Sequence, residues 1–260
     1  MDKVTTYDEF CEALGGRGDV ILFRGQPVSD FVLIPSGLRP DHRGIADIQM
    51  FRFVDAMQQV FGYDELTCIE VAQHFSLPTR MLDFSYSYTV GLFFACYDAK
   101  GRYGDCDGKV YVFNKSRYEW ILKQLGKNSA EVVRSNEYLY KWLQHYVDKS
   151  DTRMGDDGLD MPIFVEATRQ FDRLYSQRGL FLLWGRDEIC LEKIFEKEGI
   201  DERDVFDTVV ISAEHKKSIL QELREKHISQ DSLFLNSEWI KELVSTIKYG
   251  ERCRDGKEQS

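Results

Sequence analysis

The sequence lacks the usual marks of a metal site, a disulfide framework or a membrane protein. Its six cysteines include no Cys-x-x-Cys pair and no close Cys/His spacing, so neither zinc nor disulfides are indicated. The longest apolar-rich run, 89–97, is about half the length that a bilayer crossing needs, and the first residues contain no apolar signal segment. We therefore predict a cytoplasmic protein with reduced thiols, no bound metal and no membrane partner.

Basic residues are outnumbered by acidic ones, 34 Lys and Arg against 44 Asp and Glu. The formal net charge is −10, which argues against generic nucleic-acid binding, because such binding depends on cationic surface that displaces counterions from phosphates. Much of the acidity lies in residues 148–161, a charged, glycine-containing stretch that predicts an exposed loop. The polar segment 250–260 is predicted to be a flexible tail.

The composition that remains is typical of one globular domain. Hydrophobic residues make up 43% and aromatic residues 13% of the 260 positions, enough for a sizeable core, so we predict a single domain over 1–260. Strand and helix patterns do not alternate regularly, and this favours an α+β fold in which helices surround a small mixed β-sheet. Strands are expected at 20–23, 109–113, 163–167, 180–183 and 205–211, and helices from the Thr6-x-x-Glu9 capping box, over 45–61, 64–75 and 88–99, from the Ser116-x-x-Glu119 box, and over 130–147, 187–197, 213–226 and 237–248.

A concentration of polar residues stands out in residues 71–85, within an otherwise apolar segment. Gln73, His74, Thr79, Arg80 and Asp83 alternate there with apolar residues around a proline. A buried polar group without a partner costs about 1–3 kcal/mol, so these side chains must satisfy one another or meet a ligand. The residue before the proline disfavours a helix. The segment is therefore expected to span a helix end, a turn and the start of the next helix.

Together with three further motifs, this segment resembles the FRG domain family. The tripeptide Phe23-Arg24-Gly25 is followed by Gln26, residues 72–97 carry the Ala-Gln-His and Leu-Pro-Thr-Arg-Met-Leu-Asp runs, and Gln177-x-Gly179-x-Phe181 follows Arg173. Ile228, Leu233 and Phe234 match the family's C-terminal pattern. The resemblance spans about 6–248, and the four ordered motifs are more specific together than any one alone.

Arg24 is the main candidate for a ligand contact, since its guanidinium suits a phosphate or carboxylate and the following glycine permits close approach of a backbone or a ligand. An internal ion pair with Asp83 is the structural alternative. Arg80 and Asp83, three residues apart, would pair with each other if the turn were helical. The candidate catalytic residues are His74 and Gln177. The candidate ligand-binding residues are Arg24, Gln26, Gln73, Thr79, Arg80, Asp83, Ser85 and Arg173.

Two classes of function stay open. An arginine-glycine closing an early strand also resembles the first motif of ADP-ribosyltransferases, which implies an NAD-using enzyme with a split sheet, although Gln177-x-Gly179 lacks that family's carboxylate, and Glu166 and Glu188 are the nearest acids. The alternative is a non-catalytic module that binds a nucleotide or another phosphate-bearing ligand, a protein or a nucleic-acid partner. The resemblance to this family also implies a role in bacterial or phage conflict, as a toxin or a phage-defence protein.

Overall fold

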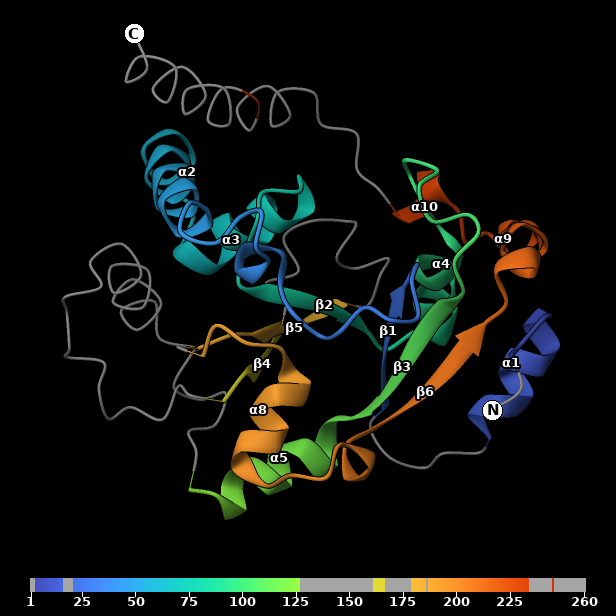
Figure 1. Ribbon diagram of the computed structural model, residues 1–260. Coiled ribbons are helices and arrows are strands. Elements are labelled where there is room, and N and C mark those ends of the chain that lie inside the picture. The colour runs from blue at the N-terminus through green and yellow to red at the C-terminus, as the bar shows by residue number, and fades with distance from the viewer. Residues whose placement is uncertain are drawn as a thin grey trace, which may run out of the picture.

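The computed structural model describes residues 3–15, 21–126, 161–166, 179–185, 187–233 and 245, and its centre is an open sheet (Figure 1). Six strands follow the order β4-β5-β2-β1-β3-β6, and every neighbouring pair is antiparallel. The α+β class is confirmed, whereas the prediction of a mixed sheet is wrong for the described strands. The strands are β1 (Ile21–Gln26), β2 (Met81–Ser85), β3 (Gly108–Asn114), β4 (Ile163–Glu166), β5 (Gly179–Leu183) and β6 (Phe206–Ile211).

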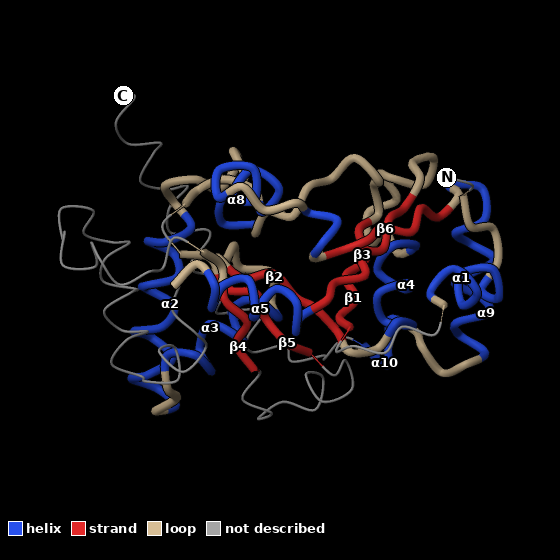
Figure 2. Tube along the Cα trace, turned by 90° about the horizontal axis from the view of Figure 1, so that it is seen from below, coloured by secondary structure: helices blue, strands red, loops and turns tan. Residues whose placement is uncertain are grey.

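Helices cover both faces of this sheet. Figure 1 shows α2, α3 and α4 above the strands and α5 and α8 below them, and Figure 2, seen from below, shows α5 in front of the strands. No helix in the described ranges is long and apolar enough to cross a membrane. The helices are α1 (Tyr7–Leu14), α2 (Ala46–Phe61), α3 (Glu65–His74), α4 (Tyr88–Cys96), α5 (Lys115–Gln124), α8 (Leu191–Glu198), α9 (Lys216–Glu225) and α10 (Gln230–Leu233), with short 3₁₀ turns η1 (Ser36–Leu38), η3 (Glu202–Asp204) and η4 (Ala213–His215).

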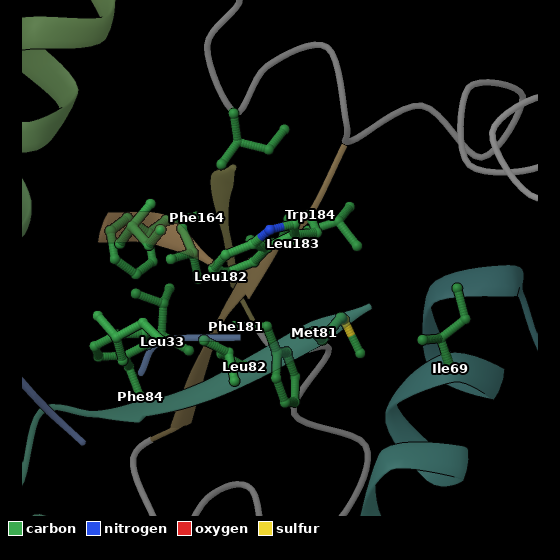
Figure 3. Packing of buried hydrophobic residues seen from close by; sticks show 14 of the residues in the cluster. Leu33, Ile69, Met81, Leu82, Phe84, Phe164, Phe181, Leu182, Leu183 and Trp184 are labelled. Atoms are coloured by element: carbon green, nitrogen blue, oxygen red, sulfur yellow. The ribbon is translucent and has the colours of Figure 1, made fainter. Parts of the chain in front are cut away.

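The buried side chains form two clusters. One joins α4, α1 and α9 to β1, β3 and β6, and includes Phe23, Val110 and Ile211. The other joins β2, β4 and β5 to α2 and α3 and to α5 and α8. Figure 3 shows part of this second cluster, in which side chains of the three strands are seen with Ile69 of α3. Helices α3 and α4 thus belong to different clusters.

The segment after His74 departs from its predicted structure. Residues 81–85 form strand β2 rather than the start of a helix, because Met81, Leu82 and Phe84 are buried while β2 pairs with β5 over five positions. The helix that follows is present but ends at Cys96. Strand pairing and burial outweigh the short-range signals here.

Helix starts were predicted with mixed success. Thr6 caps α1 by accepting from the Glu9 amide, as predicted, whereas Asn114 rather than Ser116 caps α5. The predicted helices over 130–147 and 237–248 lie outside the described residues, apart from the isolated Ser245. Of the predicted acidic loop 148–161, only Met161 is described, and it is buried in the core.

Candidate functional site

A cavity of about 330 Å³ lies where β1 and β2 separate. These strands are paired through only Phe23 and Ser85, whereas β1 pairs with β3 over six positions. The helices α3 and α4 lie on the same side of the sheet (Figure 1) and contribute to the walls. The lining residues are Phe23, Arg24, Gly25, Ser36, Glu70, Gln73, His74, Ser76, Leu77, Asp83, Phe84, Ser85, Val90, Gly91, Phe94 and Phe181.

Gly25 explains why α4 lies so close to β1. A Cβ atom at Gly25 would lie 1.9 Å from the carbonyl oxygen of Gly91 and 2.4 Å from the amide nitrogen of Ala95. A Cβ atom at Gly91 would in turn lie 2.8 Å from that of Phe23. The glycine of the tripeptide therefore admits the backbone of α4, which is the first of the two kinds of close approach that the sequence allowed.

Arg24 reaches across the gap between the two strands. Its Nη1 donates a hydrogen bond of 2.7 Å to the backbone carbonyl of Asp83, a carbonyl of β2 at the point where pairing with β1 has stopped. Among the described residues Arg24 forms no ion pair, and its buried Nε has no hydrogen-bond partner. The ion pair with the Asp83 carboxylate, the structural alternative for Arg24, is not formed, and a contact to the main chain of Asp83 takes its place.

The charge of Arg24 is held in an unfavourable environment. Burial lowers the pKa of its guanidinium; the Asp83 charge counters this effect, and the positive charge of Arg39 adds to it. An arginine remains charged in proteins nonetheless. The structure thus contains a permanent cation that lines a cavity and has little compensation from the described part of the chain.

Gln73 holds the carboxylate of Asp83. The Gln73 Nε2 donates to Asp83 Oδ2 at 2.9 Å, while the hydroxyl of Thr79 donates to Gln73 Oε1. Thr79 Oγ1 accepts from the Met81 amide at 3.1 Å. Three of the predicted ligand-binding residues are thereby joined in one hydrogen-bonded chain, and Gln73 and Asp83 line the cavity.

His74 and Ser85 also line the cavity, and so does Glu70, which the sequence analysis missed. The His74 ring packs edge-on against Phe75 at 4.8 Å between centroids, and Ser85 Oγ accepts from the Ser87 amide at 2.9 Å. Glu70 is buried on α3. Its spacing from Gln73 and His74, three and four residues, places it on their helix face, and this spacing was the sequence signal that could have identified it.

Arg80 lies outside the cavity lining. Its Nε and Nη2 donate to the two carboxylate oxygens of Asp47 at 2.9 and 2.8 Å, and Nη2 also donates to Glu188 at 3.0 Å. Because residues 81–85 form a strand, the helical spacing that would pair Arg80 with Asp83 does not exist. The buried guanidinium instead joins α2 to the segment before α8, which is a structural role.

Of the remaining candidate residues, only Gln26 is described, and it does not line the cavity. Gln26 is buried, and its Nε2 donates to the Val32 carbonyl at 3.2 Å. Arg173 and Gln177 lie outside the described residues. Gly179, two residues after Gln177, is described and pairs with the cavity residue Ser85.

Histidine, acidic and cysteine side chains are the possible metal ligands and thiols of the chain. In the described ranges no group of three or more His, Cys, Asp or Glu residues could hold a metal ion. The five described cysteines, Cys11, Cys68, Cys96, Cys106 and Cys190, are free thiols.

Comparison with known families agrees with the resemblance seen in the sequence. Residues 19–103 match the family model of the FRG domain, and all the cavity-lining residues except Phe181 fall within that range. The motifs around Gln177 and after Ile228 lie beyond the match. No curated protein and no solved structure matches the chain. Residues 19–103 therefore carry the match to the FRG domain, and most of the cavity lining lies within them.

Proposed function

We propose that the cavity binds a nucleotide or another phosphate-bearing ligand, with Arg24 as the anion contact. The observation that supports this most is the state of Arg24: a permanent cation lines a cavity, donates one hydrogen bond to a carbonyl and has a buried, unpartnered Nε. A planar guanidinium can bind two oxygens of one phosphate through its N–H groups.

The rest of the lining fits a ligand that also carries a ring. Phe23, Phe94 and Phe181 contribute apolar surface, and Gln73, Asp83 and His74 contribute polar atoms. Small-molecule sites combine apolar walls with placed polar groups, and here polar and apolar residues share the lining about equally; the volume of about 330 Å³ lies at the lower end of the range of such sites. A ligand that places only part of itself inside would suit this size.

The acidic net charge does not oppose this proposal. Arg39 lies close enough to lower the pKa of Arg24, so two cations act on the same region. A local positive potential attracts an anion even when the net charge of −10 slows its approach.

The free thiols described above are those expected in a cytoplasmic protein.

A second candidate function is ADP-ribosyltransferase-like chemistry on NAD. It is favoured by Glu70 and Asp83, whose carboxylates line the same cavity as Arg24 and could provide the acid that Gln177-x-Gly179 lacks. Departure of nicotinamide leaves positive charge on the ribose, and a carboxylate in a cavity stabilises such charge. A role as a toxin or phage-defence protein rests on the family resemblance alone, and a non-catalytic module for a protein or nucleic-acid partner is the alternative.

Calorimetric titration at moderate salt tests the proposal, with NAD, ATP and a short oligonucleotide as probes. Arg24→Met should weaken nucleotide binding at least tenfold. Arg203→Met is the matched control, because it removes the same charge from a fully solvated arginine paired with Asp201, and it should leave affinity unchanged. Release of nicotinamide from NAD, measured by chromatography, would support the enzyme. No heat with any probe would refute nucleotide binding and favour a protein partner.

A further inference from the structure

We infer that the ligand carries a hydrogen-bond donor, such as a sugar hydroxyl, beside its anionic group, and that Asp83 selects for this donor. The inference rests on the proposed function and adds to it the class of ligand. Asp83 is the exposed residue of β2, between buried neighbours on both sides, and it lines the cavity. At this exposed position the Asp83 side chain adds little to packing, so its role must come from its carboxylate oxygens.

The Asp83 carboxylate can accept more hydrogen bonds than it receives from the described residues. Among the described residues it accepts one hydrogen bond, from Gln73 Nε2 at 2.9 Å, whereas an ionised carboxylate offers about four lone-pair positions. Ligand groups that can use the remaining positions are donors: hydroxyl, amine or amide N–H. A bare phosphate oxygen cannot, and it would be repelled by the carboxylate.

A chain of hydrogen bonds, in which each donor and acceptor is determined, fixes the orientation of the Asp83 side chain. Thr79 Oγ1 accepts from the Met81 amide at 3.1 Å, so its proton is available to Gln73 Oε1. The Gln73 amide must then direct Nε2 towards Asp83, because the opposite orientation would place its oxygen against the carboxylate. Gln73 and Thr79 are thus positioning residues for Asp83.

The anion contact and the acceptor are adjacent because both involve Asp83. Arg24 Nη1 binds the backbone carbonyl of this residue at 2.7 Å, while the Asp83 side chain presents the acceptor. Since both residues line the same cavity, a ligand that uses both must carry its anion and its donor close to each other. Ribonucleotides meet this requirement, since their hydroxyls lie on the sugar that bears the phosphate.

The test compares ADP with 2′,3′-dideoxy-ADP, which differ only in the sugar hydroxyls. Sites built to bind a hydroxyl reject analogues that lack it, so the wild-type protein should bind ADP at least tenfold more tightly. Asp83→Asn keeps an oxygen for Gln73 but removes the charge, and it should abolish the preference for ADP over the dideoxy compound. Thr79→Val should reduce the preference by releasing Gln73, and Arg24→Met should weaken both ligands by the same factor.

The outcomes separate the two proposals. Equal affinity of the wild-type protein for ADP and dideoxy-ADP would overturn the role of Asp83 and leave the anion site intact. Failure of both compounds to bind would overturn nucleotide binding, and the inference with it. A preference for ADP that survives in Asp83→Asn would show that another residue selects the hydroxyl. The comparison of the two ligands on the wild-type protein decides the matter even if a variant fails to fold.

Discussion

Replacing Arg24 with methionine distinguishes a ligand-facing arginine from a structural one. Methionine keeps an unbranched apolar stem and removes the charge. The variant loses the hydrogen bond to the Asp83 carbonyl, a charged hydrogen bond that contributes about 1.5–3 kcal/mol. It also removes a buried Nε without a partner in the described structure, a group whose burial costs about 1–3 kcal/mol. These terms oppose each other, so the free energy of unfolding should change by less than about 2 kcal/mol.

Arg80 provides the contrast within the same protein. Its guanidinium is buried and pairs with Asp47 and Glu188. Arg80→Met leaves the two carboxylates without their cation, and the loss of one partner of a buried ion pair costs about 3–5 kcal/mol. At about 2–4 °C for each kcal/mol in a protein of this size, Arg80→Met should lower the melting temperature by about 6–20 °C.

Thermal and urea unfolding followed by circular dichroism would measure both variants. Arg24→Met should unfold close to the wild-type temperature and lose nucleotide binding, whereas Arg24→Lys should fold normally and bind weakly, because lysine keeps the charge without the planar fork. The reasoning would be refuted if Arg24→Met lost as much stability as Arg80→Met while Arg24→Lys bound like the wild type. Arg24 would then serve only to join β1 to β2.

Three further predictions follow from packing and burial. Gly25→Ala should destabilise the protein by about 3 kcal/mol or more, since its Cβ would lie 1.9 Å from a carbonyl oxygen of α4. The control is Gly104→Ala, whose Cβ would meet nothing within 4 Å. Equal melting temperatures of the two variants would contradict the close packing of α4 on Gly25. Burial raises the pKa of Tyr118 in the folded protein above the unfolded value of 10.0, so the stability it provides is complete below pH 10 and is lost as the pH rises further. Tyr118→Phe should make alkaline unfolding less steep while costing about 1–3 kcal/mol at neutral pH, because it loses the 2.5 Å bond to a backbone carbonyl; an unchanged alkaline slope would count against this. Burial raises the pKa of Cys68 and of Cys96 to about 12, so iodoacetamide at pH 8 should label them on the order of 10³-fold more slowly than a free thiol, as peptide mass spectrometry would show; rapid labelling before unfolding would contradict their burial.

Much of the site could be predicted because the polar residues of 71–85 conflict with their apolar surroundings. Gln73, Thr79 and Asp83 bond to one another, which is one of the two outcomes expected for such a group of polar side chains. Glu70 could have been added from its helical spacing to Gln73. The chain segment itself therefore contained the main signal for the site.

The partners of the arginines could not be predicted, because they depend on long-range pairing. Arg80 meets Asp47, 33 residues earlier, and Glu188, 108 residues later. These contacts arise only after β2 has paired with β5 as a strand. The sequence pattern around Pro78 indicated a turn and a helix, and the helical spacing then suggested the wrong partner for Arg80.

Phe23, Arg24 and Gly25 have three separate physical tasks at the point where β1 leaves β2. Phe23 forms the single residue pair between these strands and packs edge-on against Tyr88, at the start of α4. Arg24 binds the β2 carbonyl that β1 no longer meets, and Gly25 admits α4 against the strand. Two of these tasks are purely structural, so loss of function in a Phe23 or Gly25 variant would report on the opening of the sheet and not on ligand contact. Of these three residues only Arg24 brings side-chain charge to the opening, and for this reason its substitutions, rather than those of its neighbours, can separate binding from folding.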